Sequence, residues 1–150
     1  MKLASALTER SDLQRRIAEI SKRLANNAKV QEGDSPAENP AELLQELDGC
    51  LARLEELVTR IKLTNSTAVS DGKTMTELLA HRDSLQQRLR ILRSFLDAAS
   101  CRIDRYSKAE IRILSTVPVA EIQKDVDSYS KELREINERI QELNWTTELQ

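Results

Sequence analysis

Aromatic residues are scarce in this chain of 150 residues. It has only four of them: Phe95, Tyr106, Tyr129 and Trp145. Any hydrophobic core must therefore be thin and built from aliphatic side chains. Glycine is equally rare, and its three occurrences lie far apart. A glycine-rich loop that cradles phosphate is thereby excluded.

Long apolar stretches are also missing. No segment approaches the ~20 apolar residues that a helix needs to span a bilayer. The first ten residues, MKLASALTER, lack the apolar centre of a secretion signal. The two cysteines, Cys50 and Cys101, are isolated and predict no disulfide, as is usual in a reducing compartment. We therefore expect a cytoplasmic protein that does not enter a membrane.

Neither sign of charge dominates the chain. It has 23 basic and 25 acidic residues, which are interspersed and give a net charge of −2. A surface that binds duplex nucleic acid usually needs a basic surplus, so we expect no nucleic-acid partner. Hydrophobic residues make up 39% and charged residues 32%, which excludes a disordered chain and is typical of long helices or coiled coils.

Residues suited to catalysis or metal binding are few. His81 is the only histidine, and it has no cysteine or histidine neighbour at the spacing of metal ligands. No Glu-x-x-His pair is present for a di-iron site in a helical bundle. Asp83 and Ser84 follow closely, but a helix points them in other directions than His81. We expect no metal, no cofactor and no enzymatic activity.

What the chain does contain is an internal repeat. The residues around Arg10 recur around Arg82, an offset of 72, and those around Arg60 recur around Arg139, an offset of 79. The matched positions are mostly leucine, isoleucine, arginine and asparagine. The repeats cover about residues 3–67 and 75–146, and they predict two related helical hairpins.

Apolar residues spaced by three and four predict four helices, over residues 2–28, 40–64, 75–100 and 118–144. Asn39-Pro40 and Thr74 with Glu77 are typical helix starts. The first and second helices are expected to pack against each other along one stripe on each. The stripe of the first helix is Leu3, Ala6, Arg10, Leu13, Ile17, Ile20 and Leu24. The stripe of the second is Leu44, Leu47, Leu51, Leu54, Val58 and Ile61, and Cys50 and Leu57 widen it. The third and fourth are expected to use Leu78, Arg82, Leu85, Leu89, Leu92, Leu96 and Ala99, and Ile122, Val126, Tyr129, Leu133, Ile136, Ile140 and Leu143.

Three connections break this pattern. Asp71-Gly72 is typical of a tight turn and allows a small β-ribbon. Residues 29–39 contain the turn residues of a loop. Within residues 101–117, Ile111, Ile113 and Val117 alternate with polar residues as in a short strand, for which residues 29–32 are a candidate partner.

The predicted fold is all-α, with a possible short β-ribbon, and it forms a single domain of residues 1–150. Its two antiparallel hairpins pack into an elongated four-helix bundle or coiled coil. This places one group of residues together at one end: Arg10, Arg82, Asn65, Asn144 and Trp145. Trp145 is expected to plug that end, and the two arginines form either an ion pair that fixes helix register or a paired anion site. A slender bundle buries little area, so a homo-oligomer, a dimer or higher, is expected.

Several motifs resemble an uncharacterised bacterial family of helical proteins, some members of which are labelled septicolysin. They are NAKVQEG (27–33), DRYS (104–107), EI (110–111), STV (115–117) and NWTT (144–147). The resemblance covers essentially the whole chain. At position 118 the family usually has an acidic cap residue, and this chain has Pro118. The label implies membrane lysis, although the sequence has no apolar insertion segment or basic amphipathic face.

The motifs of this resemblance fall largely in the two irregular loops, and loops on a rigid scaffold often carry function. The candidate ligand-binding residues are Gln31, Glu32, Arg105, Tyr106, Ser107 and Glu110. A β-ribbon that seals the bundle or joins subunits is the structural alternative for the same loops. The sequence thus predicts a non-enzymatic helical oligomer that acts through protein contacts. The alternatives are a small-ligand binding or catalytic protein with its site in loops 29–39 and 101–117, and a membrane-active protein like septicolysin.

Overall fold

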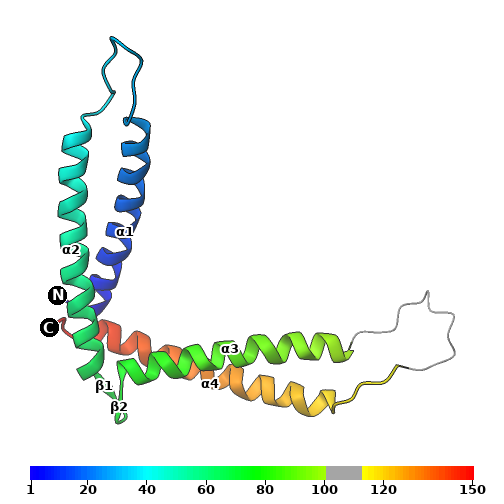
Figure 1. The fold of residues 1–150 in the computed structure, drawn as a ribbon. Coiled ribbons are helices and arrows are strands. Elements are labelled where there is room, and N and C mark those ends of the chain that lie inside the picture. Colours follow the sequence, from blue (N-terminus) through cyan, green and yellow to red (C-terminus); the bar gives the residue numbers. More distant parts are fainter. Residues whose placement is uncertain (101–112) are drawn as a thin grey trace. The chain divides into compact units, whose positions relative to one another are not determined.

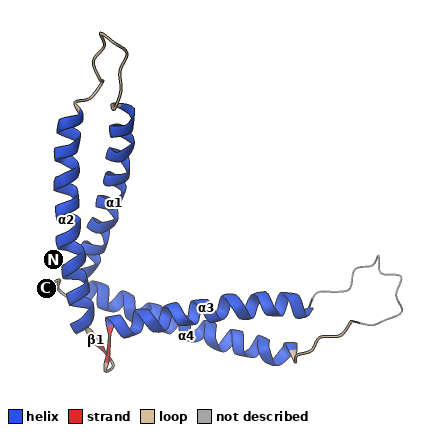
Figure 2. Cartoon of the chain, viewed as in Figure 1, coloured by secondary structure: helices blue, strands red, loops and turns tan. Residues whose placement is uncertain are grey.

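A computed structural model describes residues 1–100 and 113–150 (Figure 1). These residues form four helices and two short strands, and they confirm the all-α fold with two hairpins (Figure 2). The elements are α1 (Leu3–Asn26), α2 (Pro40–Thr67), β1 (Val69–Ser70), β2 (Lys73–Thr74), α3 (Met75–Ser100) and α4 (Val119–Thr146). We call α1 and α2 hairpin 1, and α3 and α4 hairpin 2.

The chain divides into two compact units. The first contains residues 1–74 and 142–150, and the second contains residues 75–141. Hairpin 1 lies in the first unit together with the end of α4 and the tail that follows it. The packing of both hairpins into a single bundle stays a prediction.

Local sequence sets the boundaries of α2 and of the small sheet. The Asn39 side chain accepts a hydrogen bond from the Ala41 amide at 3.0 Å, and Pro40 occupies the first helical position, which needs no donor. Asp71 and Gly72 have φ angles of 49° and 77°, the left-handed conformation that reverses the chain. Val69 pairs with Thr74 and Ser70 with Lys73, which confirms a β-ribbon at this turn.

The seam of hairpin 1 runs along one side of each helix. Figure 1 shows α1 and α2 lying side by side and antiparallel. Ile20, Leu43 and Cys50 are buried together in the half of this seam nearer the loop, and four aliphatic residues pack around them: Leu13, Ile17, Leu24 and Leu47. Toward the first residues of α1, Leu3 and Ala6 are fully buried, so the predicted stripe of α1 is confirmed.

The predicted stripe of α2 was wrong by one position along much of its length. The buried residues are Leu43, Cys50, Leu57, Ile61 and Thr64. Leu44 and Leu51, which were assigned to the seam, are 50% and 45% exposed. The predicted row and the observed row of α2 both have the three-and-four spacing of a coiled coil. The predicted row contains larger leucines where the observed row has Cys50, and size did not decide which row packs on α1. The observed register leaves two leucines, Leu44 and Leu51, outside the core.

Hairpin 2 has a seam of the same kind. Leu89 and Leu96 of α3 are buried against Val126 of α4, and five partly buried residues surround them: Leu92, Val119, Ile122, Tyr129 and Leu133. Leu78, Leu85, Ile136 and Ile140 are also buried. The predicted stripes of α3 and α4 are therefore confirmed.

The tail after α4 runs back along the start of α1. The Leu3 amide donates to the Thr147 carbonyl at 3.0 Å, and the Leu149 amide donates to the Met1 carbonyl at 2.8 Å. Leu149 is only 7% exposed, so it fills a place in the core of the first unit. Trp145 is 67% exposed, and the expectation that it plugs the bundle was wrong. The short polar tail, in place of the large aromatic residue, closes this end of the unit.

The strand predicted near the other loop does not form in the described residues. Residues 113–117 contain no strand, and neither do residues 29–32. Ile113 and Val30 are 70% and 49% exposed. The alternation of Ile113 and Val117 with polar residues is too short to specify a strand without a partner edge. Ile111 lies outside the described residues.

Candidate functional site

Hairpin 1 has one flank that is tied together by ion pairs. Arg53 of α2 contacts Glu9 of α1 at 2.6 Å, and Arg16 of α1 contacts Glu46 of α2 at 2.7 Å. Arg23 pairs with Glu38 in the loop just before α2. We call these six residues the paired flank. On the helices, each of its residues directly precedes a seam residue, which places all of them on the same side of the seam.

The pair between Glu9 and Arg53 is bidentate, because Arg53 donates to both carboxylate oxygens of Glu9, at 2.6 and 3.0 Å. The hydrogen bond from Arg53 lowers the pKa of Glu9, and that from Arg23 lowers the pKa of Glu38. A lowered pKa in the folded state means that both pairs stabilise the hairpin above the ordinary pKa of a glutamate. That contribution is lost as the pH falls through the lowered values.

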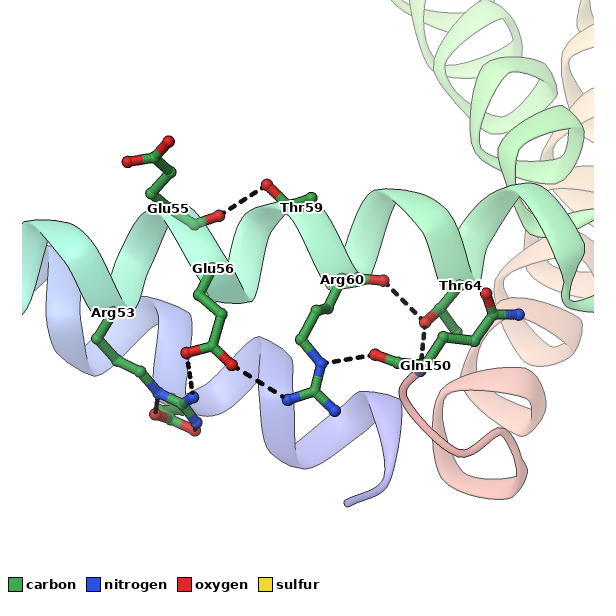
Figure 3. A network of polar contacts seen from close by, with 8 residues as sticks. Arg53, Glu55, Glu56, Thr59, Arg60, Thr64 and Gln150 are labelled. Carbon is green, nitrogen blue, oxygen red and sulfur yellow. Dashed lines mark hydrogen bonds and ion pairs between the residues drawn. The ribbon is translucent and has the colours of Figure 1, made fainter.

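The paired flank continues to the tail of the chain (Figure 3). Arg53 also donates to Glu56 at 2.9 Å, and Arg60 contacts the same carboxylate at 3.4 Å. Arg60 donates to the Gln150 carbonyl at 2.6 Å, while the Gln150 amide donates to the Thr64 hydroxyl at 3.0 Å. The cationic groups on this flank therefore already have anionic or carbonyl partners within the chain.

At the other end of hairpin 1, a buried amide holds the loop between the helices. Asn27 is 8% exposed, and its side chain donates to the Arg23 carbonyl at 2.8 Å. Its oxygen accepts the Glu38 amide at 2.9 Å, which closes the loop onto the end of α1. Both groups of the Asn27 amide are thus used for structure.

The opposite flank of hairpin 1 carries no charged residue. Its members directly follow seam residues, so they lie across the seam from the paired flank. We call them the uncharged flank: Leu7, Gln14 and Ser21 on α1, and Leu44, Leu51 and Val58 on α2. Leu44 and Leu51 are about half exposed, and Val58 is partly buried. Hairpin 1 therefore has one flank satisfied by ion pairs and one flank that leaves apolar side chains uncovered.

The repeat provides an internal comparison for the uncharged flank. At the offset of 79, Leu44, Leu51 and Val58 correspond to three polar residues in α4: Gln123, Ser130 and Asn137. Ser130 accepts a hydrogen bond from Arg93 at 3.1 Å. Hairpin 2 shows that this fold tolerates polar residues at these three positions. The apolar residues of hairpin 1 are thus not required by the architecture.

Grooves on the described surface are open to solvent, and they differ in charge. One of about 590 Å³ lies along hairpin 1 and is lined by Asp12, Arg15, Arg16, Glu19, Arg23 and Glu46. Because acids and bases alternate in it, it offers no concentrated charge to a ligand. A groove of about 260 Å³ on α3 is lined by Ser84, Gln87, Arg88, Ile91 and Leu92. In this groove, the Arg88 guanidinium lies 4.8 Å from the centre of the Tyr129 ring. The positive charge of Arg88 is therefore engaged in a cation–π contact.

Within the described residues, no group of histidine, cysteine or acidic side chains has the arrangement of a metal site. His81 is the sole histidine, and its Nε2 lies 2.8 Å from Glu132. This contact joins α3 to α4 near the surface, where both side chains are roughly two-fifths exposed. The pair therefore serves as a link between the two helices of hairpin 2.

The candidate ligand-binding residues are only partly described. Gln31 and Glu32 are exposed in the loop of hairpin 1, and neither lines a groove reported above. Arg105, Tyr106, Ser107 and Glu110 lie outside the described residues. A groove of about 330 Å³ beside the start of α2 contains neither of them, and it is lined by Arg23, Ala37, Glu38, Asn39, Glu42, Leu43 and Glu46. The ligand site of loops 29–39 and 101–117 stays a prediction.

The polar residues expected at one bundle end have different environments. The Arg10 Nε atom is buried without a hydrogen-bond partner in the described structure. Arg82 pairs with its neighbour Asp83 at 2.8 Å, a contact within one helix that cannot set the register between helices. Asn144 is buried and Asn65 is partly buried, both in the first unit. No described contact joins the two arginines, and their role as a paired anion site stays a prediction.

Sequence reasoning missed the uncharged flank as a surface. The spacing of Leu44 and Leu51 predicts core positions, and both residues lie on the surface. The signal that identifies them is the comparison of the repeats, since most core positions are apolar in both copies. Leu43, Leu47 and Leu57 match Ile122, Val126 and Ile136, whereas Leu44 and Leu51 match Gln123 and Ser130.

The fold and its repeat define a protein of paired helical hairpins, and comparison places it in a family. Residues 10–149 match DUF6847, a family of unknown function, and the chain belongs to it. It is similar to a solved structure described as a functionally unknown conserved protein from Corynebacterium diphtheriae. The identity is 44%, the TM-score is 0.92, and the match covers 100% of this chain and 99% of that one. No curated protein matches the chain.

These matches support the predicted resemblance to an uncharacterised family, and neither description mentions septicolysin. Across residues 1–100 and 113–150, no helix combines the length and apolar character needed to cross a bilayer.

Proposed function

We propose that this protein works through protein–protein contacts and that the uncharged flank of hairpin 1 is the surface it uses. The observation that carries the proposal is the half-exposed pair Leu44 and Leu51 on a flank without charge. A soluble helix normally covers its exposed flanks with charged or polar residues. Hairpin 2 follows that rule at the equivalent positions, and hairpin 1 departs from it.

The energetics support a contact surface. Covering the exposed half of a leucine side chain gains roughly 1 kcal/mol, and the flank offers two leucines and a valine in a row. Small neighbours such as Ser21 and Ala18 add no bulk and no charge, so another helix can approach closely. Depletion of charge at the centre of a patch is also the compositional mark of protein interfaces.

The same reasoning disfavours a catalytic role for the described residues. Each cationic group of the paired flank has a partner in the chain, and His81 is engaged by Glu132. A reaction centre needs a nucleophile, acid or base that is poised toward a substrate space. The proposed role is therefore a non-enzymatic scaffold, as the repeated helical seams also favour.

Photocrosslinking in cells that express the full chain tests this proposal. A photoreactive phenylalanine analogue at Leu51 should give a crosslinked product of one defined mass. The same analogue at Leu63 is the matched control, because Leu63 is 54% exposed on the same helix but outside the uncharged flank. We expect at least tenfold less product from position 63. Equal labelling at both positions, or no product from position 51, would contradict a contact role for the flank.

A further inference from the structure

We infer that the partner of the uncharged flank is a second copy of this chain, and that two copies of hairpin 1 pair through it around a two-fold axis. This inference rests on the proposed function, since it names the occupant of the same surface. It assigns the partner from the complementarity of the flank with itself. Three features of hairpin 1 support it.

The first feature is shape. On α2, Leu44, Leu51 and Val58 recur every seven residues and form a ridge about 21 Å long at 1.5 Å per residue. On α1, the positions just beyond the uncharged flank are small and also recur every seven residues: Ala4, Ser11, Ala18 and Ala25. A large ridge on one helix and a small-residue groove on the other are complementary surfaces of one hairpin.

The second feature is symmetry. A two-fold axis parallel to the helices places the ridge of one copy over the groove of the other, and the same contact is made twice. The result is an antiparallel four-helix bundle in which each helix contacts one helix of its own hairpin and one of its partner's. Because the axis keeps the copies at the same height, every uncharged position of one copy meets the uncharged flank of the other.

The third feature is the charge at the edges of the flank. Arg15 is exposed on the outer side of α1, and Asp48 is exposed on the outer side of α2. The ion pairs of Glu9 with Arg53 and of Arg16 with Glu46 place Asp48 at about the height of Arg15. The two-fold arrangement therefore brings Arg15 of one copy beside Asp48 of the other, twice. Arg15 contacts Asp12 within its own chain, and the approach of Asp48 adds a second carboxylate to that neighbourhood.

The corresponding flank of hairpin 2 is a poorer occupant of this surface. It presents Gln123, Ser130 and Asn137, and Arg93 lies beside Ser130. Covering an apolar ridge with these groups would remove water from their amides and from a guanidinium without supplying partners. A second copy of the apolar flank has no such cost, so self-pairing is the better match.

Light scattering and sedimentation equilibrium of the full chain test the inference. One chain has a mass of 17.1 kDa, and we expect wild-type protein to approach twice that mass as concentration rises. The variant L44Q/L51S/V58N gives hairpin 1 the residues that hairpin 2 already carries, so the helices should still form. We expect it to dimerise at least 100-fold more weakly. L63Q is the matched control and should keep the wild-type dissociation constant.

A charge exchange provides a second arm. R15E should weaken pairing at least fivefold, and adding D48K to the same chain should restore it, because the complementary charges are then reversed together. Circular dichroism and thermal melts establish that each variant is folded. A wild-type mass of 17.1 kDa at every concentration would overturn the inference, and so would a triple variant that pairs as tightly as wild type.

These outcomes are distinct from failure of the proposed function. A photocrosslink from position 51 to a different protein, with a monomeric chain in solution, would overturn self-pairing and leave the contact surface standing. A crosslink to hairpin 2 of the same chain would also overturn self-pairing. Absence of any crosslink from position 51 would remove both proposals.

Discussion

Replacing Leu43 by alanine should lower the free energy of unfolding by about 2–5 kcal/mol, because a buried leucine leaves a cavity when it is truncated. Leu43 is 3% exposed in the first turn of α2, where it packs in the hairpin 1 seam with Ile20 and Cys50. The neighbouring change Leu44→Ala should alter it by no more than about 0.5 kcal/mol, since Leu44 is half exposed. Urea unfolding in dilute solution, where copies do not pair, measures both.

The two substitutions are chemically identical and one residue apart, so they isolate the register of α2. If Leu44→Ala cost as much as Leu43→Ala, the seam would run through Leu44 and Leu51 and the uncharged flank would not exist. If neither change had an effect, α2 would not be packed on α1 at this point.

Replacing Leu149 by alanine is expected to have the second large effect. Leu149 is 7% exposed and its amide is bound to the Met1 carbonyl, so the cavity should again cost about 2–5 kcal/mol. Trp145→Ala removes a larger side chain, but that side chain is 67% exposed, and the change should cost about 0.5 kcal/mol or less. Thermal unfolding of both variants compares them directly.

The comparison decides which residue closes this end of the first unit. A larger loss from Trp145→Ala than from Leu149→Ala would show that the tryptophan is the packed residue. Hydrogen exchange at the Leu3 amide gives an independent check, because that amide donates to Thr147 in the tail. It should exchange faster in Leu149→Ala and at the wild-type rate in Trp145→Ala.

Much of the fold was predictable because helical periodicity and capping are local signals. Asn39-Pro40 marks the start of α2, and Asp71-Gly72 marks the small ribbon. The stripes of α1, α3 and α4 were also predictable, because each has one dominant row of aliphatic residues.

The stripe of α2 could not be read from spacing alone, because it has two interleaved rows of aliphatic residues. One row, with Leu43 and Leu57, packs on α1, and the other, with Leu44 and Leu51, does not. Only the partner helix decides between them. The packing of the tail could not be predicted from the sequence either, since Leu149 follows the last helix in a short polar segment with no periodic pattern.

Only some features of the candidate site could be predicted from the sequence. The ion pairs of the paired flank join residues 30 and 44 positions apart, and no local pattern specifies such partners. The uncharged flank becomes visible when the two repeats are compared at each position. The repeat therefore identifies most positions required by the fold, and its mismatches at 44, 51 and 58 lie together on one flank.

The uncharged flank of hairpin 1 is tested most directly by the exposure of its leucine methyl groups to solvent. A soluble gadolinium chelate accelerates methyl relaxation in nuclear magnetic resonance wherever it can approach. We expect the methyl groups of Leu44 and Leu51 to be protected at high protein concentration and to become accessible on dilution, while those of Leu63 stay accessible throughout. Leu44 and Leu51 methyl groups as accessible as those of Leu63 at every concentration would contradict a contact surface formed by paired copies.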